Sequence, residues 1–156
     1  MALVRILVDG YSLLHNWPEL APGKPRHSAT SRAELIHMLT RYHDAVGTPI
    51  TIFFDGSGAP FDVPNHELTG RVEVLFSKAG QTADDLIERA THRFQPYGEV
   101  LVVTDDHAER DTVIAFGGMT SSCLGFITMV EGVLAEFAND LQHYNRTERN
   151  RYKQGR

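Results

Sequence analysis

The sequence has few of the features that mark secreted, membrane-bound or zinc-binding proteins. Of its 156 residues only Cys123 is a cysteine, so no intrachain disulfide and no cysteine-based zinc site can form. The apolar stretch before Asp9 is too short for a signal peptide or a membrane span, and no other stretch approaches the length of a span. We therefore expect a cytoplasmic protein with no membrane segment, of a length that suits one core.

Basic residues are scarce outside the C-terminal end. The formal net charge is −5, and residues 141–156 hold five basic residues and one acidic residue, so they carry +4 and leave −9 on residues 1–140. A body this acidic is unsuited to passive nucleic-acid binding, because neutralising phosphates requires Lys and Arg. The acidic residues are therefore either a solvated surface, which is their usual place, or part of a site.

Strand-like and helix-like segments alternate along the chain. Continuous apolar runs indicate strands buried on both faces, and the alternating pattern of residues 71–76 indicates a strand nearer an edge. Strands are predicted at residues 3–8, 50–54, 71–76, 100–103 and 120–124. Helices are predicted from a cap at Thr30 or Ser31 to residue 46, and at residues 83–94, 107–116 and 126–141, with polar loops at 18–31 and 57–70.

This alternation predicts an α/β fold with a mainly parallel central sheet and helices on both of its faces. Ligands bind such sheets beyond the carboxyl ends of the strands. Three of the predicted strands end in acidic residues, and a fourth acidic group opens a helix. These residues are Asp9, Asp55, the pair Asp105 and Asp106, and the helix group Asp84, Asp85 and Glu88.

Carboxylates gathered at one sheet edge would repel one another and raise one another's pKa, unless a cation lies among them. Oxygen ligands suit Mg²⁺ or Mn²⁺, which can activate water and neutralise charge on a phosphodiester. Asp84 and Glu88 are one helical turn apart and share a face, whereas Asp85 is rotated by about 100°. The pattern therefore favours a divalent metal site.

Each acidic group also has an ordinary structural explanation. Asp84 follows the capping residue Thr82, where acids favour the helix dipole, Asp55 begins a possible turn, and Asp106 can cap the next helix. Asp9 is hardest to explain in this way, because an acid directly after a buried strand loses hydration without compensation. Each group is a weak signal alone, and their placement at one predicted edge favours a site.

Four stretches of the chain carry a family resemblance. They are residues 6–14 (ILVDGYSLL), 51–56 (TIFFDG), 72–88 with its threonine-alanine-aspartate helix start, and 102–106 (VVTDD). In this order they resemble the YacP-like branch of the NYN domain family, which belongs to the PIN-like nuclease fold. The resemblance covers most of residues 4–117, and the helix start at Thr82 is its most specific part.

The resemblance implies a metal-dependent endoribonuclease that cuts RNA, either free or within a ribosome or other ribonucleoprotein, using one or two Mg²⁺ or Mn²⁺ ions. It implies a Rossmann-like, PIN-type three-layer fold over residues 1–141, followed by a basic polar tail, residues 142–156, that we expect to be frayed. Asp9, Asp84 and Asp106 match the family's acidic metal-site residues and would be the catalytic set. Glu88 matches the glutamate one turn on.

Three positions depart from the family pattern. Asp105 stands where the family often has serine, and it would ligate metal directly or through water, as would Glu88. Ser12 stands where the family has asparagine, so the orientation of Asp9 or of substrate could differ. Gly125 stands where an acid often occurs, which leaves an inactive member of the family as the alternative.

Substrate binding is expected from Ser12 and from basic residues at the rim of the site. Lys78 lies just before the acidic helix and is our first choice, followed by Arg110, Arg26 and the C-terminal arginines.

Three other functions compete with the nuclease. A receiver domain needs a lysine after its last strand, and residues 117–130 contain no lysine or arginine. A haloacid-dehalogenase phosphatase needs a second aspartate two residues after the first, where this chain has Tyr11. A catalytically inactive module that binds RNA or protein is compatible with the sequence, and metal titration would separate it from an enzyme.

Overall fold

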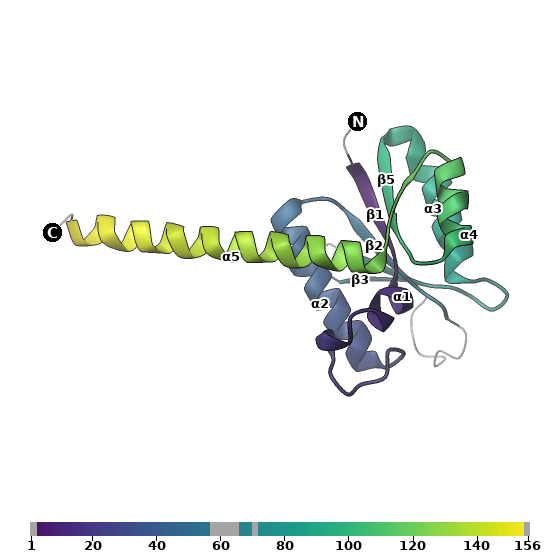
Figure 1. The fold of residues 1–156 in the computed structure, drawn as a ribbon, viewed down its shortest axis with the longest axis horizontal. Helices are drawn as coiled ribbons and strands as arrows, with labels where there is room; N and C mark the ends of the chain where they lie inside the picture. Colours follow the sequence, from purple (N-terminus) through teal and green to yellow (C-terminus); the bar gives the residue numbers. More distant parts are fainter. Residues whose placement is uncertain (1–2, 57–65, 70–71, 155–156) are drawn as a thin grey trace.

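A computed structural model describes residues 3–56, 66–69 and 72–154, which form an α/β fold around a central six-stranded sheet (Figure 1). The strands are β1 (Leu3–Asp9), β2 (Ile50–Phe54), β3 (His66–Thr69), β4 (Val72–Phe76), β5 (Glu99–Val103) and β6 (Met119–Ser121). Their order in the sheet is β3-β4-β2-β1-β5-β6. Only β3 pairs in the antiparallel sense, so the mainly parallel sheet that the sequence predicts is confirmed.

Helices cover both faces of this sheet and form a separate apolar core on each. They are α1 (Gly10–His15), α2 (Ala29–Val46), α3 (Ala83–Phe94), α4 (His107–Ala115) and α5 (Cys123–Gln154), with short 3-10 turns at Pro18–Leu20 and Gln95–Tyr97. Successive side chains of a strand point to opposite faces. Accordingly, Ile6 and Val8 of β1 pack with α1, α2 and α5, whereas Leu7 packs with α3 and α4.

The strand order sets the place of a site. From β1 the chain first adds β2 and β4 on one side, and then returns to add β5 and β6 on the other side. The order therefore reverses beside β1, which is the point where ligands bind in open parallel sheets. Helix α3, which connects β4 to β5, packs across β1 and β5, so its N-terminus lies near the carboxyl ends of both strands.

The sequence alone does not predict helix α1, because Asp9 and Gly10 indicate only the end of a strand. The carboxylate of Asp9 caps this helix by accepting a hydrogen bond from the backbone N–H of Ser12. Gly10 permits the close approach, because a Cβ at this position would overlap the ring of Phe54. The strand and the helix therefore meet without an intervening loop.

Two other boundaries differ from prediction. Ser28 rather than Thr30 or Ser31 caps α2, because the hydroxyl of Ser28 accepts from the backbone N–H of Ser31. Residues 66–69, predicted as loop, form the antiparallel strand β3 along β4, so β4 is not an edge strand. Residues 57–65 and 70 of that predicted loop lie outside the described residues.

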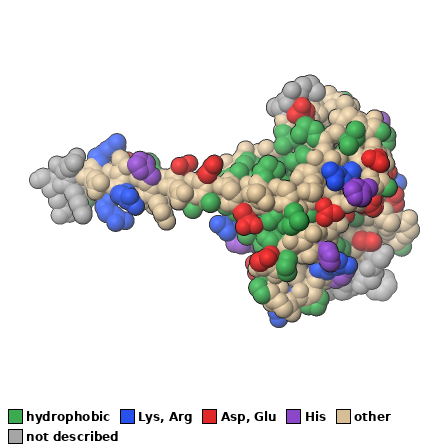
Figure 2. Space-filling model, viewed as in Figure 1, with side chains coloured by type: hydrophobic (Ala, Val, Ile, Leu, Met, Phe, Trp, Pro, Cys, Tyr) green, Lys and Arg blue, Asp and Glu red, His purple; other side chains and the backbone are tan. Residues whose placement is uncertain are grey.

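Helix α5 is longer than predicted at both ends. It begins at Cys123, so the last strand ends at Ser121, and it continues to Gln154 instead of ending at residue 141. The expectation of a frayed tail is therefore wrong for the residues described. From Ala135 onward the described side chains of the helix are mostly exposed and the helix projects from the body (Figure 1), and its described Arg side chains gather toward the far end (Figure 2).

The first turns of α5 are part of the core, whereas its projecting half is not. Cys123, Phe126 and Val130 are fully buried, which confirms the expected core position of the cysteine, whereas Phe137 and Leu141 are 42% and 47% exposed. Among the described residues, no helix is long and apolar enough to cross a membrane. The division of the chain at residue 141 stays a prediction.

Deletion of residues 143–156 is expected to change the free energy of unfolding by less than about 1 kcal/mol, because the described side chains there make little contact with the body. Phe126→Ala, in the buried part of the same helix, should cost about 3–5 kcal/mol. Urea unfolding of the three proteins measures both effects. A truncated chain as unstable as the Phe126 variant would show that the projection stabilises the body.

Candidate metal centre

Three carboxylates converge at the carboxyl edge of the sheet. Asp9 ends β1, Asp84 lies in the first turn of α3 and Glu109 lies in the first turn of α4. One oxygen from each residue lies within 4.8 Å of the other two. Asp9 and Asp84 are partly exposed, whereas Glu109 is only 3% exposed. The first two residues are predicted at this edge from the sequence, and the third is not.

Asp9 is oriented by the helix that follows it. The hydroxyl of Ser12 donates to Oδ2 of Asp9 over 3.0 Å, and the backbone N–H of Ser12 approaches Oδ1 at 3.5 Å. Ser12, which replaces the asparagine of the family pattern, therefore positions this carboxylate.

Asp84 faces the cluster because its neighbour takes the capping role. The hydroxyl of Thr82 accepts from the backbone N–H of Asp85 at 3.2 Å, and the carboxylate of Asp85 accepts from the backbone N–H of Thr82 at 3.1 Å. This reciprocal capping box leaves Asp84, rotated by about 100°, free of capping contacts. The local sequence therefore separates a structural acid from an acid of the cluster.

Glu109 is held by one oxygen and presents the other. The hydroxyl of Thr104 donates to Oε2 over 3.1 Å, while Oε1 is buried and has no hydrogen-bond partner. A signal was available in the sequence, because Glu109 stands three residues after Asp106, at the spacing of a capping box. Instead of returning to the cap, its side chain turns inward beneath α4.

The remaining predicted acids lie around this cluster. Asp106 caps α4 by accepting from the backbone N–H of Glu109, and it lies close enough to Asp9 to raise the pKa of that carboxyl. Both oxygens of Asp105 accept hydrogen bonds, one from the Asn16 amide and one from the backbone N–H of Cys123, each at 2.9 Å. Asp105 therefore ties the end of β5 to α1 and α5.

Glu88 does not join Asp9 and Asp84 in the cluster of the described residues, although it shares a helix with Asp84. It lines a separate hollow together with Asp85, Arg89, His92 and Phe116. The place expected for Glu88, beside Asp84, is occupied by Glu109 from the next helix.

Burial and repulsion raise the pKa of two of the clustered carboxyls, those of Glu109 and Asp9. Burial is the main cause for Glu109, and the close approach of the Asp84 carboxyl and repulsion from Asp84 and Asp9 add to it, raising its pKa to about 9. Burial also raises the pKa of Asp9, against the opposing effect of its hydrogen bonds from Ser12. Three ionised carboxylates in this space therefore require a compensating positive charge.

The donor set fits a divalent cation. All three groups are carboxylates, which suit hard cations, and the buried Oε1 of Glu109 faces the cluster without a donor of its own. A cation bound between the three groups would satisfy that oxygen and remove their repulsion. Burial raises the pKa of the neighbouring Cys123 thiol to about 12, so this residue supplies no thiolate ligand at neutral pH.

Asp9 and Asp84 open into a pocket of about 400 Å³. Asp55 and Asp105 also line it, as do Tyr11, Ser12, His15, Asn16, Arg26 and His27. Of the side chains predicted to bind substrate, Ser12 and Arg26 line this pocket, whereas Lys78 and Arg110 are not among its lining residues. The pocket therefore has an acidic side and a basic, aromatic side.

Comparison with known proteins agrees with the resemblance seen in the sequence. The family model of the YacP-like NYN domain matches residues 6–155. The chain is similar to the protein YacP of Bacillus subtilis (strain 168), with 29% identity over 132 residues that cover 82% of this chain and 75% of that protein.

Solved structures are similar over most of the chain. A crystal structure of a single-substitution mutant of Rae1 (YacP) from Bacillus subtilis has a TM-score of 0.76 and 25% identity, covering 90% of this chain and 82% of that chain. A second crystal structure of Rae1 (YacP) has a TM-score of 0.73 and 23% identity, covering 96% and 85% of the two chains, and it supports the fold alone.

Without divalent ions, the protein is expected to lose stability as the pH rises from about 5 to 9. The pKa of Glu109 is 4.5 in its ordinary state and about 9 in the folded protein, so between these values the folded state holds a proton that the unfolded state has released. Glu109→Gln should flatten this dependence. Melting temperatures in chelator across this pH range measure it, and parallel curves for the two proteins would contradict the burial of this carboxyl.

Mg²⁺ or Mn²⁺ is expected to raise the melting temperature, by an amount equivalent to about 2.7 kcal/mol at a hundredfold excess over Kd. Asp84→Asn should lose most of this gain and be more stable than the parent without metal, because it relieves repulsion. Glu88→Gln, one turn further along the same helix, is the matched control and should keep the gain. If both variants lost the metal-induced gain in melting temperature equally, Glu88 would also be a metal ligand.

Proposed function

The chain belongs to the YacP-like NYN domain family, and we propose that it is a metal-dependent endoribonuclease that hydrolyses RNA phosphodiester bonds with Mg²⁺ or Mn²⁺. The observation that carries this proposal is the convergence of Asp9, Asp84 and the buried Glu109 at the reversal of strand order, where Asp9 and Asp84 open into a pocket. The nuclease-type character of the family supports the same chemistry.

In this proposal Asp9, Asp84 and Glu109 hold the cation, and the groups behind them fix their geometry. Ser12 holds Asp9, and Thr104 holds Oε2 of Glu109, which leaves the buried Oε1 without a donor. A divalent ion held by these residues would lower the pKa of the attacking water and neutralise charge on the phosphodiester. The buried side of the cluster excludes bulk water from Glu109, and the open side admits the substrate.

We propose that Asp106 and Asp105 act on the cation through bound water, in addition to the three carboxylates that hold it. Asp106 contributes negative charge next to Asp9 and can accept a proton from water at the pocket edge. Asp105 keeps Asn16 and the start of α5 in place around the pocket. A direct ligand role for either residue, and for Glu88, remains part of the proposal that the variants can test.

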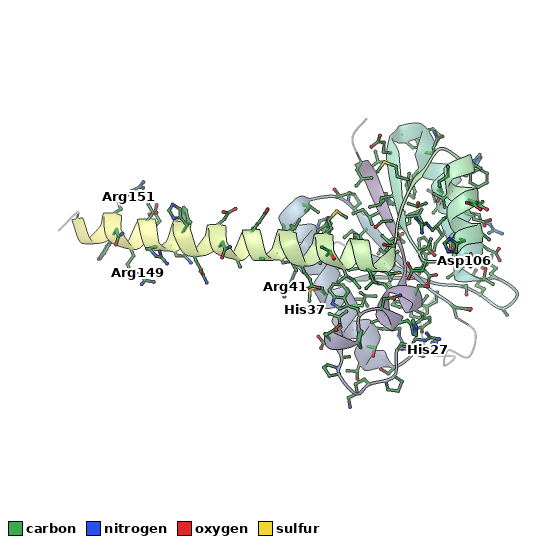
Figure 3. The ribbon with its side chains drawn as sticks, in the orientation of Figure 1. His27, His37, Arg41, Asp106, Arg149 and Arg151 are labelled. Carbon is green, nitrogen blue, oxygen red and sulfur yellow. The ribbon has the colours of Figure 1, made fainter. Side chains whose placement is uncertain are left out.

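Substrate phosphates need positive charge, since the body of the protein is acidic. Lys78 and Arg110 are proposed to contact the RNA backbone beyond the pocket. Arg149 and Arg151, which are exposed near the end of α5, could contact RNA further away (Figure 3). The proposed partner is RNA, either free or within a ribosome or other ribonucleoprotein.

The purified chain is expected to cleave single-stranded RNA with Mg²⁺ or Mn²⁺, and Asp9→Asn should reduce cleavage to background while RNA binding survives. Asparagine keeps the shape of the side chain and removes the charge that holds the cation. Product formation on labelled RNAs, both free and ribosome-associated, measures the effect.

Asp111→Asn, at an exposed position of α4 that does not line the pocket, is the matched control and should cleave like the parent. Equal cleavage by the Asp9 variant would mean that another site or a contaminant acts. Binding without cleavage on every RNA tested would favour a non-catalytic RNA-binding module.

A further inference from the structure

One wall of the pocket is built from a loop and a helix whose roles the metal chemistry leaves unexplained. Arg26 and His27 lie in the loop before α2, and Tyr11 and His15 lie on α1. All four side chains line the pocket that Asp9 and Asp84 also line. If the proposed nuclease function holds, this wall contacts part of the RNA substrate.

Arg26 is held in place without being neutralised. Its Nη1 donates to Nδ1 of His15 over 2.7 Å, and its Nε donates to Nε2 of His27 over 3.2 Å. Because arginine only donates, both ring nitrogens act as acceptors and are unprotonated. No carboxylate of the described residues forms an ion pair with Arg26. Its positive charge is therefore available to an anion in the pocket.

His27 is the outermost member of a column of aromatic rings. The ring centroids of Phe76 and Phe54 are 5.4 Å apart, those of Phe54 and Tyr11 are 4.8 Å apart, and those of Tyr11 and His27 are 4.3 Å apart. Phe54 is fully buried, whereas His27 is exposed. The column therefore runs from the core to the pocket and ends in the His27 ring, which packs at 52° against the ring of Tyr11.

Arg32 of α2 fixes the outer end of this column. Its Nη1 donates to the backbone carbonyl of His27 over 2.7 Å and approaches the hydroxyl of Tyr11 at 3.4 Å. Its guanidinium also lies 5.8 Å from the centre of the Phe76 ring. The position of His27 is thus set by the buried part of the protein rather than by the loop alone.

We propose that this wall is a nucleotide subsite, in which the ring of His27 stacks on an unpaired base and Arg26 binds the adjoining backbone phosphate. An exposed ring supported from behind is the kind of surface on which single-stranded bases stack. A guanidinium with free N–H groups suits two phosphate oxygens at once. Because the base must be unstacked to reach His27, the substrate is single-stranded RNA.

The subsite lies beside the carboxylate cluster, since Asp9 and Asp84 line the same pocket of about 400 Å³ as Arg26 and His27. A phosphate on Arg26 and a phosphate at the cluster would therefore belong to the same short stretch of RNA. The wall supplies the positive charge and the aromatic surface that the acidic side of the pocket lacks. The wall thus holds the RNA strand while the carboxylates and their cation act on the neighbouring phosphodiester bond.

Binding of short fluorescent oligoribonucleotides to the Asp9→Asn protein tests the subsite without cleavage. Arg26→Gln should weaken binding about tenfold and reduce the salt dependence by about one phosphate contact. His27→Ala should also weaken binding about tenfold, whereas His27→Trp should retain it, because stacking needs a ring and not an imidazole.

Two exposed residues of α2 serve as matched controls. His37 and Arg41 lie one turn apart on that helix, away from His27 (Figure 3), and neither lines the pocket. His37→Ala and Arg41→Gln should bind like the parent protein. Losses equal to those of the His27 and Arg26 variants would indicate only general electrostatic attraction and would overturn the subsite.

An abasic position moved along the oligonucleotide separates stacking from backbone contact. With the parent wall, one position should lose about tenfold affinity when its base is removed, and in His27→Ala the same removal should cost nothing further. If His27→Ala weakened binding of the abasic oligonucleotide as much as binding of the intact one, the stacking role would be overturned.

The outcome is distinguishable from failure of the proposed function. If the wild-type chain cleaves RNA and the Arg26 and His27 variants bind RNA unchanged, the subsite is wrong and the nuclease stands. If the wild-type chain neither binds nor cleaves any single-stranded RNA, the proposed function fails and the subsite fails with it. Equal stabilisation of the parent and both variants by Mg²⁺ is expected, since neither residue touches the cluster.

Discussion

The repulsion between Asp9, Asp84 and Glu109 is the constraint on which the rest of the site depends. The fold brings these carboxylates from β1, α3 and α4 to one place and buries the third almost completely. Their neighbours do not neutralise them. The Ser12 and Thr104 hydroxyls each satisfy one oxygen, and the raised pKa values of Asp9 and Glu109 record the cost that remains. Only a proton or a cation between the groups can offset that cost.

Three other acids at this edge accept hydrogen bonds from backbone donors and support helix termini. Asp85 completes a capping box, Asp106 caps α4, and Asp105 receives the first N–H of α5. The division between structural and clustered acids follows from the nearest donors. Asp9 belongs to both groups, because it caps α1 and also faces Asp84 and Glu109.

The pocket also separates opposite kinds of chemistry across a short distance. Its acidic side suits a cation, and its other side holds Arg26 apart from the carboxylates through two imidazoles. Without those histidines, the guanidinium could pair with an acid of the pocket and lose its value for a phosphate. The aromatic column behind His27 gives the same wall a rigid, apolar backing that reaches the core.

Local sequence patterns are enough to predict the α/β class, strands β1, β2 and β5, helix α3, and the placement of Asp9 and Asp84 at one sheet edge. These features rest on continuous apolar runs, a capping box and acids directly after strands. The residue pattern of α4 does not reveal that Glu109 is buried, since its burial depends on how α4 packs beside the end of β5. The same holds for His27, whose place depends on Tyr11 and Phe54, and for β3 and the full length of α5. Contacts between residues distant in the chain decide these features, and the tertiary structure alone supplies them.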